Sequence, residues 1–291
     1  MITASPKVRP LSGSYEPTTA DILIVKQYFK LLSIPLPDEL VDNIVDAASY
    51  WAHTSLTVNG SIVAHADQDQ DEMYMRTLPL AVYGTEGDFL LDRENLQGEG
   101  FVLSWLPPTE MEWAAPTRVK PFRKIEFQLW SHDQGWGGDH GCQGTYNGAY
   151  SWFDANVERR DSTSYFTGSI EWPSSLVFTA ADAPNLPDDV TFTQKDVKKP
   201  FLPSPTTLQK NIVAEGQTTH HIITWTDLDD VKEGSPEAMA AENRGQGWKT
   251  YDGSFVRDLQ VGDCITLWMR ARFPGWENDA VKAKITTFWA V

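Results

Sequence analysis

The sequence predicts a mainly β protein, an antiparallel β-sandwich of the jelly-roll type with a short N-terminal helical segment. After about residue 52 the chain becomes a series of short runs rich in β-branched and aromatic residues, separated by clusters of Gly, Pro, Asp and Asn. Regular helical periodicity is largely missing between these runs, which is typical of sandwiches and barrels. All 12 tryptophans except Trp51 lie at or after Trp105, a density that suits a β core or a ligand pocket.

The chain divides into three parts. Residues 1–18 are rich in proline and are expected to form a flexible arm. Residues 19–52 hold two helical patterns, and we expect this segment to dock on the core. The second pattern, LPDELVDNIVDAASYW, places Pro37 before an acidic first turn and an apolar face. It superficially resembles the start of an F-box over this one helix. Residues 53–291 are expected to form a single β-sandwich domain.

Nine segments of this domain are predicted to contain strands. SLTVNGSIVAHA is expected to form a hairpin, because Asn59-Gly60 suits a two-residue turn. The others are FVLSWL, RKIEFQLWS, AYSWFDA, SYFTGSIEW, LVFTA, THHIITWTDL, DCITLWMRARF and AKITTFWAV. One segment, SPEAMAAENRGQGW, instead predicts a short helix, with Ser235 as N-cap and Pro236 at the first helical position.

Two of these segments are similar to each other. IEFQLWSHDQGW (125–136) aligns without gaps on ITLWMRARFPGW (265–276), with Ile opening both and Gly-Trp closing both. An aromatic strand segment follows each of them. We therefore expect two equivalent strands, each entering a Gly-Trp turn, and interpret them as neighbours in one sheet.

These motifs also carry a resemblance. SHDQGWGG, GTYNGAYSWFDA, LQKN, TTHHIITW and GDCITLWMRARFPGWEN, with the ending ITTFWAV, resemble an uncharacterised family of filamentous-fungal proteins. The resemblance covers most of the chain after about residue 35 and implies a β-sandwich. Some relatives lie among genes for fungal natural products, which implies a small-molecule cyclase or isomerase of secondary metabolism. It implies no particular catalytic residues.

Composition excludes several classes of function. There are 24 basic residues against 40 acidic ones, a formal net charge of −16, which argues against a nucleic-acid surface. No apolar run approaches the ~20 residues of a membrane span, and the N-terminus lacks the apolar core of a secretory signal. Cys142 and Cys264 are the only cysteines, which fits reduced thiols in the cytoplasm. The sequence contains no phosphate loop, dinucleotide fingerprint or nucleophile elbow, so no cofactor is expected.

The stretch WSHDQGWGGDHGC (130–142) is the most concentrated source of chemical groups. His132, Asp133, Asp139, His140 and Cys142 have the donor atoms of a metal site, but their spacing matches no metal signature. We therefore expect no bound metal. If a metal ion does bind, His132, Asp139 and His140 are the candidate ligands. The alternative is that these side chains cap the backbone of a turn.

The expected catalytic residues are His132, Asp133 and Arg270. A histidine with a carboxylate partner can move protons at neutral pH, although adjacent strand residues point to opposite faces unless the chain has turned. Arg270 and Arg272 lie two apart and share one face of their strand. They face solvent, pair with carboxylates such as Asp133 or Asp263, or bind an acidic ligand oxygen. The expected substrate-binding residues are Trp130, Trp136, Trp268, Arg272, Trp276 and Glu277.

Three functions are compatible with these residues. The first is a cofactor-independent acid–base enzyme that cyclises or isomerises an aromatic, polyketide-type or prenylated small molecule. The second is a carbohydrate- or small-ligand-binding module without catalysis, and the third is an adaptor that docks a partner through its N-terminal helices. The expected partner is a small aromatic substrate, with a homodimer as a possible assembly. The positions of Trp136 and Trp276 discriminate between enzyme and binding module: a deep cavity with a histidine or arginine favours the first, and an open surface favours the second.

Overall fold

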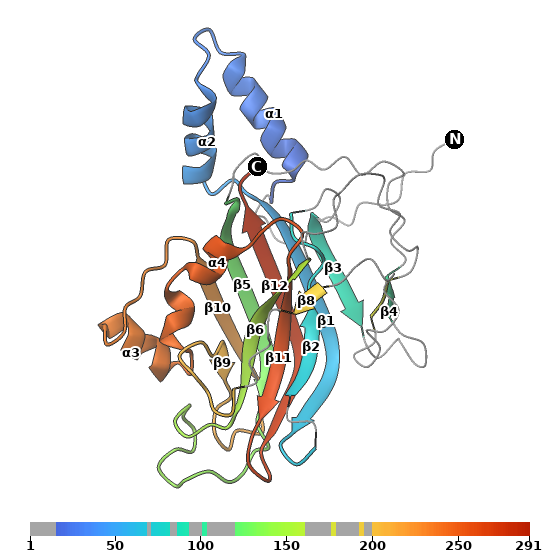
Figure 1. Cartoon of the computed structure of the whole chain (residues 1–291), viewed down its shortest axis with the longest axis vertical. Coiled ribbons are helices and arrows are strands. Elements are labelled where there is room, and N and C mark those ends of the chain that lie inside the picture. Colours follow the sequence, from blue (N-terminus) through green and yellow to red (C-terminus); the bar gives the residue numbers. More distant parts are fainter. Residues whose placement is uncertain are drawn as a thin grey trace.

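The computed structural model describes residues 16–68, 71–81, 86–92, 101–103, 120–160, 176–178, 192–194 and 200–291. Within them the protein is mainly β, with two larger sheets and a few helices. The helices at the N-terminus and the chain's C-terminus lie at one end of the molecule, and the loops after several strands lie at the other (Figure 1).

Sheet A contains five strands in the order β10-β5-β12-β1-β3. Their bounds are β10 (Thr219–Thr226), β5 (Phe122–His132), β12 (Glu277–Trp289), β1 (Ala52–His65) and β3 (Gly87–Asp92). All neighbours in this sheet are antiparallel except β1 and β3, which are parallel. From Ile125 to His132, β5 alternates between buried and half-buried side chains, as expected of a strand with one face toward the core.

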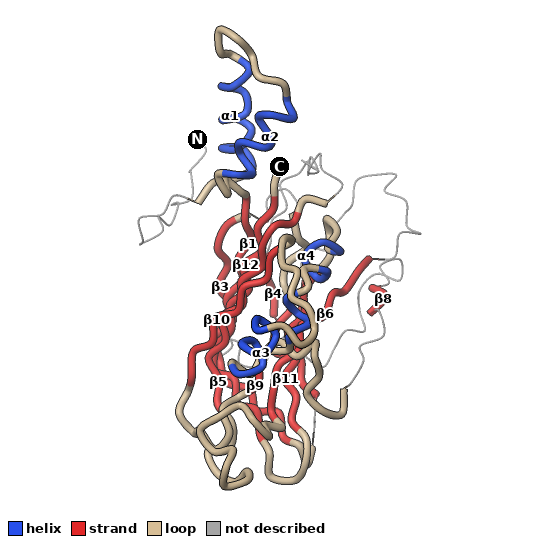
Figure 2. Tube along the Cα trace, turned by 90° about the vertical axis from the view of Figure 1, so that its left-hand side faces the viewer, coloured by secondary structure: helices blue, strands red, loops and turns tan. Residues whose placement is uncertain are grey.

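Sheet B has the order β2-β11-β6-β8, with β9 also paired to β6. The bounds are β2 (Asp71–Arg76), β11 (Cys264–Ala271), β6 (Ser151–Arg160), β8 (Phe192–Gln194) and β9 (Gln209–Lys210). A separate antiparallel pair joins β4 (Phe101–Leu103) to β7 (Leu176–Phe178). Figure 2 shows the strands of sheet A to the left of β6 and β11.

One hydrophobic core contains side chains from both sheets. Phe127 on β5 and Ile285 on β12 belong to the same buried cluster as Leu267 and Met269 on β11. Within this cluster the edge of one ring meets the face of another, with the ring centroids of Phe127 and Trp225 4.7 Å apart. Burial of these apolar side chains is the main force that holds the two sheets together.

The N-terminal helices form a projecting hairpin (Figures 1 and 2). Helix α1 (Thr19–Lys30) begins with a capping box between Thr18 and Asp21, and α2 (Asp38–Ala47) begins after Pro37 as predicted. The hairpin contacts the core at its base, where Arg123 pairs with Asp46 at 2.9 Å. Further from the base it exposes apolar side chains, including Tyr28 at 66%.

Three shorter helical elements follow β10: α3 (Pro236–Asn243), the 3-10 turn η2 (Trp248–Tyr251) and α4 (Ser254–Asp258). The predicted helix start is confirmed, because the Ser235 hydroxyl accepts a hydrogen bond from the Ala238 N–H at 3.1 Å. Within the described residues no helix combines the length and apolar character needed to cross a bilayer.

Two predictions about the strands are wrong. Asn59-Gly60 does not form a hairpin turn: β1 runs through it as one strand, with a bulge between Asn59 and Ile62 and Gly60 at φ 120°. The long partner β12 pairs with both halves of β1 and overrides the local turn signal. The matching strands 125–136 and 265–276 are not neighbours in one sheet, since β5 belongs to sheet A and β11 to sheet B. The predicted strand SYFTGSIEW lies outside the described residues.

Candidate functional site

Two Gly-Trp turns meet in space although their strands belong to different sheets. We call residues 133–136, after β5, the first corner and residues 273–276, after β11, the second corner. The loop after β5 and the turn after β11 both lie at the lower end of Figure 1. The Trp136 ring lies against the backbone of Gly275, where an added Cβ would come within 3.1 Å of the ring's Cη2. The Glu277 N–H donates to the Gln134 side-chain oxygen at 3.2 Å. The second corner therefore supports the first, and Gly275 leaves room for the tryptophan.

Asp133 fixes the shape of the first corner. Its carboxylate is 1% exposed and accepts hydrogen bonds from the Gly135 N–H at 2.8 Å and the Ala214 N–H at 2.6 Å. Burial raises the pKa of this carboxyl, and the backbone donors oppose the rise. Since both oxygens face backbone donors, Asp133 has the turn-capping role that was the alternative to catalysis.

Exposed aromatic rings gather around the corners. We define the corner aromatic cluster as Trp136, Tyr150, Phe201, Phe273 and Trp276. Trp136 is 64% exposed, Phe201 65% and Phe273 41%, whereas Trp276 is buried. The ring centroids of Tyr150 and Phe273 are 4.6 Å apart, those of Tyr150 and Trp276 5.3 Å, and those of Phe201 and Phe273 5.7 Å. Edge-to-face contacts thus connect Phe201 and Phe273 through Tyr150 to the buried Trp276.

Phe273 adopts an unusual backbone conformation. Its φ is +67°, a left-handed value that glycine adopts readily but that is rare for a bulky residue. The turn is closed by a hydrogen bond from the Trp276 N–H to the Phe273 carbonyl at 3.1 Å. Such a strained backbone conformation costs on the order of 1–3 kcal/mol. Strained residues are frequent at ligand sites, where the surrounding structure enforces the conformation. At Phe273 it places a large ring partly in solvent.

Two histidine–carboxylate pairs lie at the adjoining end of sheet A. His65 on β1 faces Glu277 across the strands, with 3.2 Å between Nδ1 and Oε1. His132 on β5 faces Asp279, with 3.5 Å between Nε2 and Oδ2, while its Nδ1 lies 2.7 Å from the Asp133 carbonyl. The partner of His132 in this site is therefore Asp279 and not the neighbouring Asp133 side chain.

Arg270 and Arg272 pair with carboxylates inside the protein. Arg270 is 0% exposed, with Nη1 2.8 Å from Asp71 and Nε 3.2 Å from Asp154. Arg272 binds the same Asp71 oxygen from Nη2 at 2.7 Å. Burial raises the pKa of Asp154, and the charge of Arg270 opposes this rise. Neither predicted partner is used, because Asp133 caps its turn and Asp263 binds Arg159. The role proposed for Arg270 in catalysis finds no support in these contacts.

Trp268 belongs to this arginine cluster and not to the corner. Its ring centroid lies 5.1 Å from the Arg270 guanidinium carbon, a cation–π contact. Arg272 links the cluster to the corner, because its Nη2 also donates to the Pro200 carbonyl at 2.9 Å, directly before Phe201. Arg272 therefore positions part of the corner aromatic cluster.

Trp130 lies on the other face of sheet A, away from the core. His220 on β10 stacks on its ring with centroids 4.1 Å apart, and the Lys282 ammonium on β12 lies 4.6 Å from its centroid. Because β10 and β12 flank β5 on opposite sides, the indole has a protein neighbour on each side. These cross-strand contacts stabilise the sheet.

The loop residues proposed as metal ligands do not come together. Asp139 and His140 are exposed. Among the described residues, a metal-like group of three ligand atoms forms instead at Glu16, His53 and Asp88.

Sequence reasoning missed several members of the corner. Phe273 lies inside the RARFPGW motif, and its position between a strand and a Gly-Trp turn could have indicated exposure. His65 and Asp279 carry no local signal, because each becomes significant only through its cross-strand neighbour. Phe201 reaches the site from a segment that contains no predicted strand or motif.

No protein-family model matches the chain, and the comparisons with curated proteins and with solved structures give no match.

Proposed function

We propose that the corner site binds a neutral carbohydrate and that the protein is a ligand-binding β module. The observation that carries this proposal is the exposed aromatic cluster on two mutually supporting corners. Trp136 and Phe201 are about two-thirds exposed, at 64% and 65%, so they do not line an enclosed cavity. Small hydrophobic ligands need a pocket that buries most of their surface, whereas the apolar faces of sugar rings can rest on open aromatic surfaces.

The polar residues beside the cluster suit a neutral ligand with hydroxyl groups. Glu277 and His65 are 42% and 40% exposed at their side chains, and both can hydrogen-bond to hydroxyls. Arg270 and Arg272 are unsuited to bind an acidic ligand, because they are already paired with Asp71 and Asp154. Glu277, the acidic side chain beside the cluster, would repel an anionic ligand.

Trp136→Ala is expected to weaken carbohydrate binding about 30-fold, roughly 2 kcal/mol, as for other exposed aromatic anchors. A glycan array of neutral and acidic oligosaccharides would identify a ligand, and calorimetric titration would measure its Kd. Tyr28→Ala is the matched control, because Tyr28 is 66% exposed but lies on α1 at the opposite end of the molecule. Binding that is equal in the two variants, or no glycan bound above background, would contradict the proposal.

A second candidate is the cofactor-independent acid–base enzyme, which would cyclise or isomerise an aromatic, polyketide-type or prenylated small molecule. His132 favours it. When Nδ1 donates to the Asp133 carbonyl, Nε2 is left to exchange protons beside Asp279, and the side chain is 22% exposed. The fungal resemblance supports the same substrate class. In this proposal Asp279 takes the orienting role first expected of Asp133.

For this second candidate, His132→Asn is expected to abolish turnover while leaving the fold intact. Metabolites of a strain lacking the gene would be compared with those of strains carrying His132→Asn or His140→Asn. We expect the deletion and His132→Asn to accumulate the same uncyclised precursor, and His140→Asn to restore the product because that side chain is exposed in the loop. A strain with His132→Asn that makes normal product would exclude the acid–base role.

We also infer that the two sheets pack face to face as a β-sandwich. The shared core of β5, β11 and β12 side chains supports this, as does the placement of the sheets in Figure 2. A cytoplasmic location is part of the proposal, supported by two cysteines that are both unpaired, Cys142 and Cys264.

A further inference from the structure

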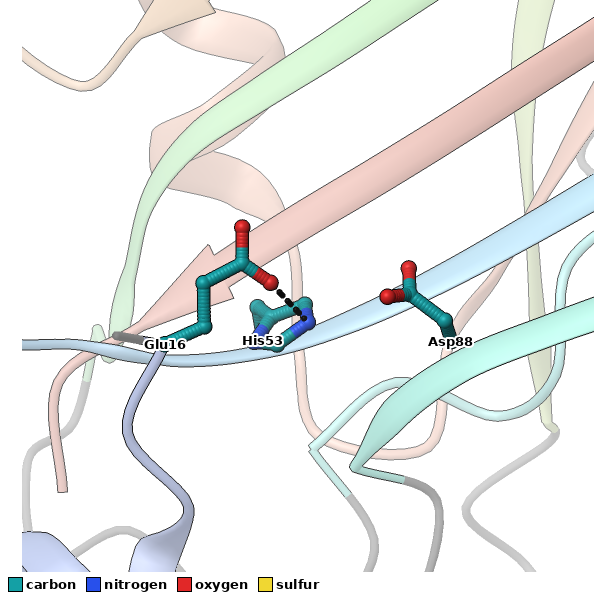
Figure 3. Close-up of side chains that lie close together, drawn as sticks. All are labelled: Glu16, His53 and Asp88. Atoms are coloured by element: carbon teal, nitrogen blue, oxygen red, sulfur yellow. Dashed lines mark ion pairs between the residues drawn. The ribbon is translucent and has the colours of Figure 1, made fainter. Parts of the chain in front are cut away.

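A second group of chemically active side chains lies at the opposite end of the molecule from the corner. Glu16 precedes α1, His53 lies near the start of β1, and Asp88 lies on the neighbouring strand β3. One ligand atom from each lies within 4.8 Å of the others. Figure 3 shows the imidazole of His53 between the two carboxylates. Three segments that are distant in sequence therefore bring three metal-ligating groups together.

The buried nitrogen of His53 is the observation that points to a ligand. The His53 side chain is 8% exposed, and its Nε2 lies 3.0 Å from a Glu16 carboxylate oxygen. The angles of this contact do not make a hydrogen bond, so Nε2 is a buried polar atom without a hydrogen-bond partner. Buried polar atoms of folded proteins are almost always satisfied, and an ion is one of the usual partners that explain an exception.

We propose that Glu16, His53 and Asp88 bind a divalent transition-metal ion, with Zn²⁺ as the preferred ion. One imidazole and two carboxylates form a ligand set that zinc accepts, and three protein ligands leave a fourth position for water. The two carboxylates would balance the charge of the ion. Tetrahedral zinc with bonds of about 2.0–2.2 Å needs ligand atoms about 3.3 Å apart. Glu16 and Asp88 can close to this distance because their side chains are 45% and 57% exposed.

Neighbouring contacts already hold the same segments together. The Thr19 hydroxyl on α1 donates to the Glu86 carboxylate at 2.6 Å, directly before β3. The Lys284 ammonium lies 3.4 Å from Asp88, on a side chain that is 31% exposed, and competes with the ion for this one carboxylate. The ion would therefore add a second link between the start of α1 and sheet A, and would anchor the helical hairpin.

The test uses the full chain, stripped with a chelator and titrated with ZnCl2 by calorimetry. We expect one ion per chain, and binding at least about tenfold weaker in Glu16→Gln, His53→Gln and Asp88→Asn. Glu233→Gln and His140→Gln are the matched controls, since both residues are exposed and distant from the group in sequence. Glu16→Gln decides the outcome if His53→Gln does not fold, because Glu16 is half-exposed.

Hydrogen exchange adds a readout of anchoring. Zn²⁺ is expected to slow amide exchange in α1 of the wild-type chain and to have no such effect in Glu16→Gln. Absence of saturable Zn²⁺ binding would overturn the proposal. Wild-type affinity in Glu16→Gln, or saturable binding of Mg²⁺ or Ca²⁺ in preference to Zn²⁺, would overturn it equally.

Discussion

Arg270→Met is expected to lower the free energy of unfolding by about 3–5 kcal/mol, the usual cost of removing one partner of a buried ion pair. Arg270 is completely buried, and it is the residue that offsets the charge of the buried Asp154 carboxylate. Arg272 still pairs with Asp71 in the variant, so the uncompensated charge is that of Asp154. Denaturant unfolding at neutral pH measures the loss directly.

A second variant separates the effect of charge on stability from the effect of packing. The double variant Arg270→Met, Asp154→Asn is expected to recover much of the loss, because neither buried charge then remains. The loss in the single variant should also shrink in acid, where the Asp154 carboxyl takes up a proton. Lys232→Met is the control: its ion pair with Asp230 is exposed, and we expect a change within about 0.5 kcal/mol. An Arg270→Met protein as stable as this control would contradict the argument.

The sequence predicted the arginines of this buried ion-pair cluster but not their carboxylate partners. Spacing of two along a strand placed Arg270 and Arg272 on one face, and the cost of burying them indicated carboxylate partners. The partner itself, Asp71, is separated from Arg272 by 201 residues and lies on a strand that the sequence did not predict. A single sequence carries no information on which strand lies beside which. The expected partners were therefore Asp133, which lies in the matching motif, and Asp263, which is close to the arginines in sequence.

The same distinction applies to the corners. Their Gly-Trp ends were visible as a repeat, and the two corners do meet at Trp136 and Gly275. Their strands nevertheless lie in different sheets, because a local match in sequence specifies a strand-to-turn shape and not a pairing partner. At Asn59-Gly60 the long ladder between β1 and β12 turned a hairpin signal into a bulge. Local chemistry thus predicted shapes, and long-range pairing decided neighbours.

Acid is expected to destabilise the protein through His221, by about 3 kcal/mol between pH 7 and pH 4. This histidine on β10 is 7% exposed, and its Nε2 is buried without a hydrogen-bond partner. Burial, with a smaller contribution from the charge of His220, lowers the pKa of His221 from 6.5 to about 4. A difference of about 2.5 pH units at about 1.4 kcal/mol each gives about 3.5 kcal/mol. About 3 kcal/mol of this is lost by pH 4, where the folded histidine is itself about half protonated.

The sign follows from proton linkage. Between pH 6.5 and 4 the unfolded chain binds a proton at this position and the folded chain does not, so stability falls as the pH is lowered through this window. His221→Leu removes the titrating group and should therefore lose about 3 kcal/mol less than the wild type over the same change of pH. Denaturant unfolding of both proteins at pH 7 and pH 4 gives the two differences.

Comparing pH differences, instead of stabilities at one pH, separates the titration from any repacking around the new side chain. Carboxyls whose pKa is raised, such as Asp133 and Asp154, respond to acid in both proteins, so their contribution cancels in the comparison. His140→Leu removes an exposed histidine and should keep the wild-type pH difference. If His221→Leu loses as much stability on acidification as this control, the buried neutral imidazole is not the acid-sensitive group of the fold.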